Sequence, residues 1–237
     1  MNAKDLSMRL QRAAEYVPQG ARLADIGSDH AYLPVALMLQ NRISYGIAGE
    51  VVKGPFESAK RQVAKNGLVD KIDVRLADGL EAITLADDIS AVTICGMGGV
   101  LIRDILQRGK EQTRLSGNER LILQPNVGER QLRGWLVQEG YTIIAESILE
   151  ENQKVYEIIV AEKKDETTAY SAKEVFFGPH LLQEQNKIFI EKWQHKLIKS
   201  EKILASLKRS DQDVADKIKE VEQEITWIQE VIASARD

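Results

Sequence analysis

Residues 22–34 read RLADIGSDHAYLP, and this stretch decides the fold. A short apolar run, Arg22 to Ile26, ends in Gly27, and a polar turn separates it from a second apolar segment. That succession is typical of a buried strand, a tight turn and a helix. Glycine at the turn permits a sharp bend and a close ligand approach that a side chain would block. The stretch therefore predicts the first strand, turn and helix of a nucleotide-binding α/β sheet.

Short apolar runs and amphipathic stretches continue to alternate through the first 160 residues. Repeated strand, helix, strand units of this kind build a parallel sheet. We expect five parallel strands at 22–26, 45–50, 72–76, 92–95 and 121–124, with helices at 8–17, 33–40, 55–66, 100–107 and 129–139. Two β-rich runs, 141–149 and 155–162, flank a short polar segment and predict a hairpin that closes the sheet.

The composition changes after Lys163, where a polar linker precedes a new pattern. Apolar residues then recur at heptad spacing, with Ser200 in one seam position: Ile190, Trp193, Leu197, Leu204 and Leu207, then Val214, Ile218, Val221, Ile225, Ile228 and Ile232. Two such seams joined by a polar turn at 210–213 predict an antiparallel coiled-coil hairpin. We therefore expect an α/β domain over 1–162, followed by a linker and coiled coil over 163–237.

The composition excludes several classes of protein. Of the 237 residues, 43% are hydrophobic and 29% are charged, which suits a folded domain with an appendage and not a disordered chain. No apolar run approaches the roughly 18 residues of a membrane helix. The amino terminus lacks the pattern of a signal peptide, so we expect a cytoplasmic protein. One cysteine and three histidines cannot form a disulfide framework or a cysteine-rich zinc site, and no metal is expected.

The net charge of −4 hides strong local patterning. Residues 187–209 contain seven basic and two acidic side chains, whereas residues 211–230 contain seven acidic and two basic ones. Residues 103–133 contain seven basic and four acidic side chains. Charged outer positions of a coiled coil are usually just solvated, but a basic surplus confined to one helix suits contact with a phosphate backbone.

The residues that follow the strands are informative, because ligands of open α/β sheets bind at the carboxyl ends of the strands. Asp29 and Ala31 stand where a glycine-rich loop has its later glycines, and the Asp29 carboxylate would repel a pyrophosphate. Glu50 ends the second strand, where it can accept hydrogen bonds from both ribose hydroxyls. Asp78 follows the third strand, where it can meet an adenine amino group. Together these acids favour S-adenosylmethionine, whose sulfonium and ammonium groups suit a carboxylate-rich pocket.

The last two parallel strands end in different groups. The segment CGMGG, residues 95–99, has three glycines that leave room for a ligand edge or a flipped base, and Met97 could pack on a ring. Cys95 is interpreted as a small buried filler and not a nucleophile, since no partner base is evident. Asn126 follows the fifth strand. Its amide could pair with the Watson–Crick edge of adenine, or only shape the turn.

The whole chain also resembles a known family. The resemblance rests on ADIGSDHAYLP (24–34), AGEVVKGPFESA (48–59), LADGL (76–80), CGMGG (95–99), LQPN (123–126) and FGPHL (177–181), followed by the helical hairpin. These segments resemble the bacterial tRNA (adenine(22)-N(1))-methyltransferase family. The resemblance implies a Rossmann-like class I methyltransferase sheet closed by a β-hairpin, with a coiled-coil appendage that binds tRNA. It implies methylation of N1 of adenine 22, in the D-arm region, with S-adenosylmethionine.

The strand ends and the resemblance together give an expected site. Cofactor contacts are expected from Asp25, Gly27, Ser28, His30, Glu50, Val51, Asp78, Gly79, Gly96 and Met97. For catalysis we expect Asp29 to stabilise the charge that develops on the base, Asn126 to orient the base, and Tyr32 to stack on it or hydrogen-bond to it. We expect tRNA to contact the stretches from Lys187 to Arg209 and from Arg103 to Arg133, and the protein to be a monomer.

Several of these residues also have a purely structural interpretation. Asp78 could be a turn former, Asp29 could cap the next helix, and His30 could be a satisfied hydrogen-bonding residue. Two other functions also stay open. One is a noncatalytic RNA-binding protein on a degenerate nucleotide-binding fold, which would have no reason to keep Glu50 and Asp78. The other is a nicotinamide-dependent oxidoreductase, which the missing glycines disfavour.

Overall fold

The structure is a computed structural model that describes residues 6–166, 168–209 and 214–235. The chain divides into two compact units, Met1–Pro179 and His180–Asp237. Within the described residues, no helix combines the length and the apolar character needed to cross a membrane. The same residues contain no group of three or more His, Cys, Asp or Glu side chains that could hold a metal ion.

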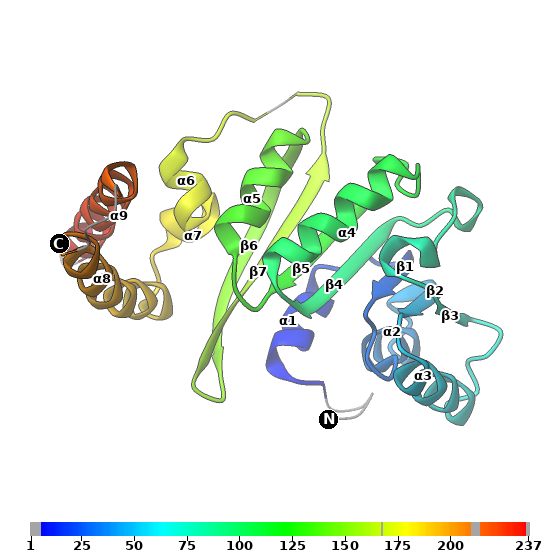
Figure 1. The fold of residues 1–237 in the computed structure, drawn as a ribbon. Helices are drawn as coiled ribbons and strands as arrows, with labels where there is room; N and C mark the ends of the chain where they lie inside the picture. The colour runs from blue at the N-terminus through cyan, green and yellow to red at the C-terminus, as the bar shows by residue number, and fades with distance from the viewer. Residues whose placement is uncertain (1–5, 167, 210–213, 236–237) are drawn as a thin grey trace. The chain divides into compact units, whose positions relative to one another are not determined.

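A seven-stranded sheet forms the first unit, with the strand order β3-β2-β1-β4-β5-β7-β6 (Figure 1). The five strands β1 to β5 are parallel, and β7 runs antiparallel to both β5 and β6. The strands are β1 (Ala21–Ile26), β2 (Ile43–Glu50), β3 (Ile72–Leu76), β4 (Ala91–Met97), β5 (Arg120–Pro125), β6 (Tyr141–Glu151) and β7 (Lys154–Lys163). The predicted parallel strands and the predicted closing hairpin are both confirmed.

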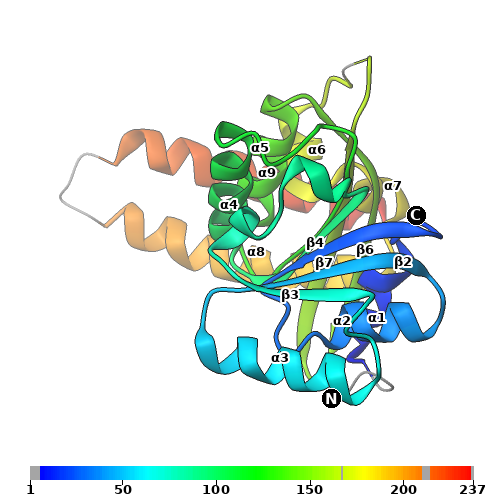
Figure 2. The ribbon, with the colours of Figure 1, turned by 90° about the vertical axis from the view of Figure 1, so that its right-hand side faces the viewer.

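Helices cover both faces of this sheet. In Figure 2, α1, α2 and α3 lie below the sheet, and α4 and α5 lie above it. The helices of these two layers are α1 (Met8–Glu15), α2 (Tyr32–Leu39), α3 (Lys53–Lys65), α4 (Gly99–Glu111) and α5 (Glu129–Gln138). Two short 3-10 helices, η1 (Gly79–Ala82) and η2 (Leu85–Asp87), follow β3. All five predicted helices are present.

The central strands are buried on both faces, as expected for parallel strands between two helical layers. Leu23 and Ala24 are adjacent in β1 and point to opposite faces, yet both are fully buried. Leu23 packs in the cluster with α1, α2 and α3, and Ala24 packs in the cluster with η1, α4 and α5. The strand therefore reads as a continuous apolar run, and its one acid, Asp25, is carried into the interior.

The described residues between β7 and Pro179, which are 164–166 and 168–179, pack within the first unit. The Tyr170 hydroxyl hydrogen-bonds to the backbone of Ile143, at 3.0 Å from its nitrogen. Helix α6 (Ala172–Phe177) begins with a capping box between Ser171 and Glu174, and the side chain of Phe177 is fully buried. The compact units thus divide after Pro179, whereas the composition of the sequence predicts a division after residue 162. The short helices α6 and α7 (Pro179–Glu184) are not among the predicted elements.

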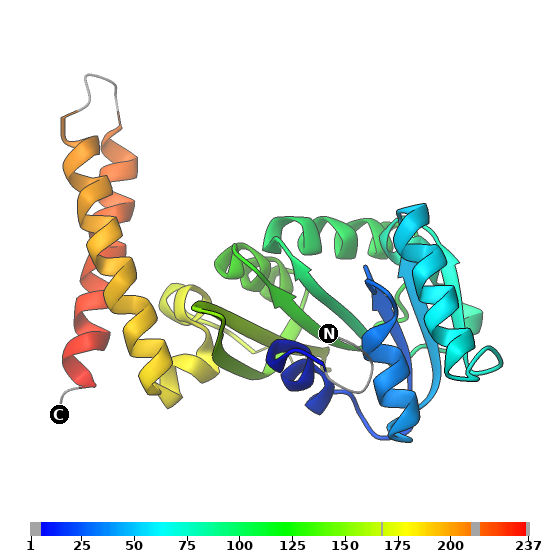
Figure 3. The same cartoon turned by 90° about the horizontal axis from the view of Figure 1, so that it is seen from below.

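Two antiparallel helices, α8 (Lys187–Leu207) and α9 (Ala215–Ser234), form the hairpin of the second unit (Figure 3). Phe189, Trp193 and Ser200 are the buried residues of α8, and they follow the heptad seam. Ser200 occupies its predicted seam position, but Phe189 is buried more deeply than the predicted Ile190, because the seam runs one residue earlier at that end. The predicted turn at 210–213 lies outside the described residues.

Candidate functional site

The carboxyl ends of β1, β2, β4 and β5 meet where the strand order reverses. β1 lies between β2 and β4, so successive crossovers leave it in opposite directions. Ligands of doubly wound sheets bind in the crevice that this reversal creates. The loops that follow these strands contain most of the residues predicted for the site.

Asp25, near the end of β1, has a buried carboxylate that is held by hydrogen bonds. Its side chain accepts hydrogen bonds from the Ser28 and Thr93 hydroxyls, each at 2.6 Å. Only 4% of the residue is exposed. Burial raises the pKa of the Asp25 carboxyl, and the two hydroxyl groups oppose that shift. Ser28 therefore donates a hydrogen bond to Asp25. Thr93 of β4 is a second donor, which the sequence pattern did not reveal.

The loop after β1 has an unusual backbone. Asp29, His30 and Ala31 all have positive φ angles, of 39°, 66° and 56°. Each such non-glycine residue costs on the order of 1–3 kcal/mol and persists only when its surroundings impose it. The Glu50 carboxylate supplies one such constraint, because it accepts a hydrogen bond from the backbone N–H of Asp29. Asp29 therefore does not simply cap α2, whose first turn begins after the left-handed Ala31.

Glu50 is itself buried, with 6% of the residue exposed. Burial raises the pKa of the Glu50 carboxyl, while the bond from the Asp29 N–H lowers it. A buried carboxylate at the end of β2 thus holds the β1 loop in place. One of its oxygens makes that bond, and a carboxylate has further lone pairs for the two ribose hydroxyls proposed from the sequence.

Two aromatic rings flank the outer side of this loop. The His30 and Tyr32 rings are stacked, with centroids 5.3 Å apart and planes inclined by 29°. Nε2 of His30 lies 3.3 Å from an Asp29 carboxylate oxygen, whose side chain is 69% exposed. The predicted trio of Asp29, His30 and Tyr32 is therefore brought together at the surface of the site, with the Asp29 carboxylate open to a ligand.

Close packing of glycines shapes the floor of the site. A Cβ atom on Gly27 would lie 2.1 Å from the Met97 methyl group, so the Met97 side chain covers that turn. Gly96 has a φ of 81° and forms the irregularity in the pairing of β4 with β5. A Cβ atom on Gly99 would lie 2.2 Å from the carbonyl oxygen of Gly128. The loops after β4 and β5 are thus in backbone contact, which explains the density of glycines in CGMGG.

A chain of amide groups links the ends of β4 and β5. The Gln124 Oε1 atom accepts from the Gly96 N–H at 3.1 Å and from the Arg9 guanidinium at 2.7 Å. The Asn126 Nδ2 group donates to the Gly96 carbonyl at 2.8 Å, and its Oδ1 accepts from Gln124 Nε2 at 3.3 Å. Asn126 is exposed and keeps one N–H donor and one lone pair for another group. Both predicted interpretations of Asn126, in the turn and toward a base, are compatible with this geometry.

The third strand end differs from its prediction in one respect. The Asp78 carboxylate is paired with the guanidinium of Arg108 on α4, at 2.7 Å and 3.3 Å. That hydrogen bond lowers the pKa of Asp78. An adenine amino group would therefore have to share Asp78 with Arg108. Gly79 beside it has a φ of 58°, and Val51 on the neighbouring strand end is 62% exposed.

Cys95 was predicted to be a small buried filler, and in the structure it is partly buried. It lies at the carboxyl end of β4 and packs on the cluster of apolar residues with α1 and α2. Burial raises the pKa of its thiol, so the nucleophilic thiolate form is disfavoured.

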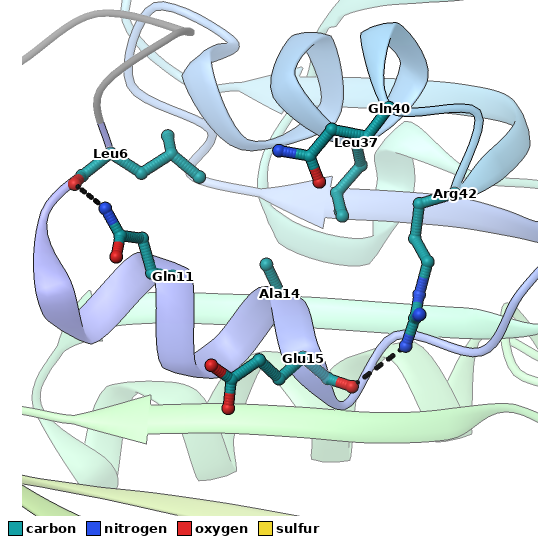
Figure 4. A pocket seen from close by; sticks show the side chains of 7 residues that line it. All are labelled: Leu6, Gln11, Ala14, Glu15, Leu37, Gln40 and Arg42. Atoms are coloured by element: carbon teal, nitrogen blue, oxygen red, sulfur yellow. Dashed lines mark hydrogen bonds between the residues drawn. The ribbon is translucent and has the colours of Figure 1, made fainter.

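A small cavity of about 30 Å³ opens at the β1 loop, lined by Arg9, Leu10, Asp25, Gly27, Ser28, Asp29, Leu33 and Cys95. A larger pocket of about 330 Å³ lies between α1 and α2 (Figure 4). Two of its polar side chains are engaged, since Gln11 donates to the Leu6 carbonyl and Arg42 donates to the Glu15 carbonyl. Arg42 directly precedes β2, so this pocket lies toward the amino ends of the strands and away from the site.

The two basic stretches predicted to contact tRNA differ in their surroundings. In 103–133, Arg108 pairs with Asp78, Lys110 with Glu139 and Arg120 with Glu162. Arg133 is 1% exposed and bonds to Glu146 at 2.7 Å and to Glu157 at 2.5 Å. For Arg133 the prediction of a tRNA contact is wrong, because the residue compensates two buried carboxylates. Much of the apparent surplus in this stretch is internal ion pairing.

In the stretch 187–209, three lysines in the middle of α8 differ from the basic residues of 103–133. Lys196, Lys199 and Lys202 are exposed, and among the residues that the structure describes none of the three makes an ion pair. Lys187 and Lys208 have acidic neighbours, at 3.7 Å and 2.7 Å. The middle of α8 therefore keeps a solvent-facing positive charge.

The structure brings four residues to the site that were not assigned to it from the sequence: Arg9, Thr93, Arg108 and Gln124. Gln124 stands in the strand-end segment LQPN and was within reach of the strand-end rule. Arg9 and Arg108 lie on helices, and Thr93 lies inside a strand, so that rule does not point to them. Their signal is a distance in space and not a spacing in sequence.

The strand order, the switch point and the acidic strand ends define a Rossmann-like class I methyltransferase fold. A family model described as tRNA (adenine(22)-N(1))-methyltransferase matches residues 23–230. The chain belongs to this family. It is 46% identical over 238 residues to the tRNA (adenine(22)-N(1))-methyltransferase of Bacillus subtilis, covering 98% of this chain and 99% of that protein.

Solved structures agree with this assignment. The crystal structure of Streptococcus pneumoniae Sp1610, a putative tRNA (m1A22) methyltransferase in complex with S-adenosyl-L-methionine, has a TM-score of 0.86 and 45% identity, with 96% of this chain and 100% of that chain covered. The structure of M. capricolum TrmK in complex with S-adenosyl-homocysteine has a TM-score of 0.82 and 28% identity, with 96% of this chain and 98% of that chain covered.

Proposed function

We propose that this chain transfers the methyl group of S-adenosylmethionine to N1 of adenine 22 in bacterial tRNA. The observation that carries the proposal is similarity to the Bacillus subtilis enzyme along essentially the entire chain. The buried strand-end acids Asp25 and Glu50 support it, because a protein that only bound RNA would gain nothing from burying them. We further propose that the enzyme is a cytoplasmic monomer.

The residues at the strand ends fit the chemistry of this cofactor. Glu50 would accept the ribose hydroxyls, Asp78 with the exposed Val51 would flank the adenine, and the acidic β1 loop would face the cationic end. At Gly27 and Gly96 the lack of a Cβ atom lets the Met97 and Arg9 side chains pack against the loops, so both side chains would lie beside a ligand bound there. When bound, S-adenosylmethionine supplies an electrophilic methyl group, and the C–S bonding pair returns to sulfur as the methyl leaves.

The acceptor needs no strong base in the enzyme. Neutral adenine carries a lone pair on N1, and the methylated ring is positively charged. The work of the protein is therefore to extrude the base, to align N1 and to stabilise the new charge. We propose that Asn126 Oδ1 accepts from the adenine amino group, which leaves N1 free to react. Asp29 would face the charged ring, and Tyr32 with its stacked partner His30 would support the base.

The hairpin would hold the tRNA through exposed lysines of α8. Within the two basic stretches, Lys196, Lys199 and Lys202 suit phosphate contacts, because they are exposed and carry charge that no ion pair compensates among the residues described. The stretch 103–133 would contribute less, since acidic neighbours neutralise Arg108, Lys110 and Arg120.

Transfer of labelled methyl groups to tRNA transcripts tests the activity. A transcript with adenine 22 should yield 1-methyladenosine on nucleoside analysis, and a matched transcript with guanine at position 22 should not. Asp29→Asn should lower kcat far more than it lowers affinity for S-adenosylmethionine. Equal methylation of both transcripts would overturn the proposed target, and normal kcat in Asp29→Asn would remove that residue from the mechanism.

A salt titration tests the tRNA-binding surface. Replacement of Lys196, Lys199 and Lys202 by Gln should flatten the slope of log affinity against log salt by up to about three units, roughly one per phosphate contact. The control replaces Lys217 and Lys219 of α9, which already pair with acids of their own helix. An unchanged slope in the triple variant would show that the middle of α8 does not contact the tRNA.

A further inference from the structure

We infer that Arg9, on helix α1, binds the carboxylate of the amino-acid end of the cofactor. The inference rests on the proposed function, because it takes S-adenosylmethionine as the ligand. It adds a residue that lies outside every loop at the carboxyl ends of the strands. Its basis is the position of Arg9, its lack of a charged partner and the charge of its surroundings.

Helix α1 delivers Arg9 to the carboxyl ends of the central strands. The guanidinium donates to Gln124 Oε1 at 2.7 Å, across 115 positions of sequence. Its Nη1 atom would lie 3.2 Å from a Cβ atom on Gly96. Arg9 also lines the small cavity at the β1 loop, together with Asp25 and Asp29. The guanidinium therefore stands between the loops that follow β1, β4 and β5.

This guanidinium is half-buried and has no acidic partner among the described residues. Its hydrogen-bond acceptor is a neutral amide, and its other close neighbour is the Tyr156 ring, 5.7 Å away. Asp25 and Asp29 line the same cavity as Arg9, but neither carboxylate makes an ion pair with the guanidinium, since Asp25 accepts from two hydroxyl groups and Asp29 lies beside His30. A guanidinium has five N–H donors, so most of them stay available. A partly buried cation without a counter-charge suggests that a ligand supplies the anion.

The charge pattern of the cavity indicates which anion. An amino-acid end carries an ammonium and a carboxylate side by side, and the nearby sulfonium adds a second positive charge. Asp25 and Asp29 suit the positive groups but would repel the carboxylate. Among the residues that line this cavity, Arg9 is the basic one. The guanidinium fork matches a carboxylate bidentately. At about 30 Å³ the cavity admits a small polar group and not a nucleoside, which agrees with the amino-acid end entering it.

Calorimetric titration of the full-length protein with two ligands tests this inference. One ligand is S-adenosylmethionine, and the other is its decarboxylated analogue, which keeps the sulfonium, the ammonium and the adenosine. Arg9→Ala should weaken binding of S-adenosylmethionine by about tenfold to a hundredfold, as for the loss of a charged hydrogen-bond partner. The same substitution should leave affinity for the analogue nearly unchanged. Arg9→Lys should retain part of the preference for the carboxylate, because it keeps the charge but not the fork.

Arg12→Ala is the matched control, since Arg12 lies on the same helix and pairs with the exposed Glu15 at 3.0 Å. It should bind both ligands as the wild type does. Equal weakening of both ligands by Arg9→Ala would overturn the inference and assign Arg9 a structural role through Gln124. Unchanged binding of S-adenosylmethionine with weaker tRNA binding would overturn it in favour of a phosphate contact.

The unmodified protein gives an independent result that does not depend on the folding of a variant. It should prefer S-adenosylmethionine over the decarboxylated analogue by a factor similar to the loss in Arg9→Ala. Equal affinity for the two ligands would overturn the inference about Arg9 alone. Binding of neither ligand would instead overturn the proposed function, and this inference with it.

Discussion

Replacement of Glu50 separates two tasks that one buried carboxylate performs in this structure. Glu50 accepts the Asp29 N–H and so holds a loop of three consecutive left-handed residues. It is also the proposed acceptor for the ribose hydroxyls. Glu50→Gln keeps an oxygen for the Asp29 N–H but loses the charge, whereas Glu50→Ala loses both. The two variants should therefore differ in cofactor affinity and in stability.

The magnitude follows from the contacts. Loss of a hydrogen bond to a charged group costs about 1.5–3 kcal/mol, which is roughly a tenfold to 150-fold loss of affinity. Glu50→Gln should lie near the lower limit. The affinity loss in Glu50→Ala should reach the upper limit or exceed it. Without the Glu50 carboxylate, the loop leaves its left-handed conformation in part of the protein, and only the remaining fraction can bind. Burial raises the pKa of Glu50, so its ionised form is disfavoured in the folded protein. Glu50→Gln should thus cost little stability.

The assay combines calorimetric titration with S-adenosylmethionine and urea unfolding of the free protein. Asp70→Ala is the control, because Asp70 is exposed and lies two residues before the amino end of β3, away from the site. Affinity equal to that of the wild type in both Glu50 variants would refute the assignment of Glu50 to the cofactor. Equal affinity losses in the two variants, with equal stability losses, would refute the separation of the two tasks.

Three further predictions follow from the site and its support. Burial raises the pKa values of Asp25 and Glu50 above their ordinary 3.8 and 4.5, so their contribution to stability is favourable at low pH and is lost as pH rises through the folded-state pKa values. Binding of S-adenosylmethionine, which needs the ionised forms, should weaken on acidification and release protons, measurable by calorimetry in buffers of different ionisation enthalpy. Gly99→Ala should destabilise the protein and reduce methylation, since its Cβ would lie 2.2 Å from a backbone oxygen. Gly98→Ala is the control and should be tolerated, because a Cβ there would have no neighbour within 4 Å among the described residues. Equal melting temperatures and equal rates of methyl transfer in the two variants would contradict this prediction. Arg133→Met should lower the free energy of unfolding, measured with urea, by about 3–5 kcal/mol, because the two buried carboxylates would lose their cationic partner. A loss below about 1 kcal/mol would contradict the role of Arg133 in compensating those carboxylates.

Much of the architecture was predictable because it depends on local patterns. The apolar run at 22–26 and the heptad seam of 214–232 each reflect the period of the element they form. Parallel strands then place their carboxyl ends together whatever the details of packing. For this reason Glu50 and Asp29 could be assigned to one site before their contact was known, and the structure joins them by a hydrogen bond.

The helices and strands, their order and the strand ends at which the site forms all follow from the pattern of residues along the chain. Which charges face that site follows from how the chain packs in three dimensions. Arg9 donates to Gln124 from a helix far away in sequence, and Arg108 pairs with the Asp78 carboxylate. Arg133 is buried in an ion pair and does not reach the surface. The physical reason is that periodicity is a property of neighbouring residues, whereas the effect of a charge depends on its burial and on the partner that packing brings within a few ångströms.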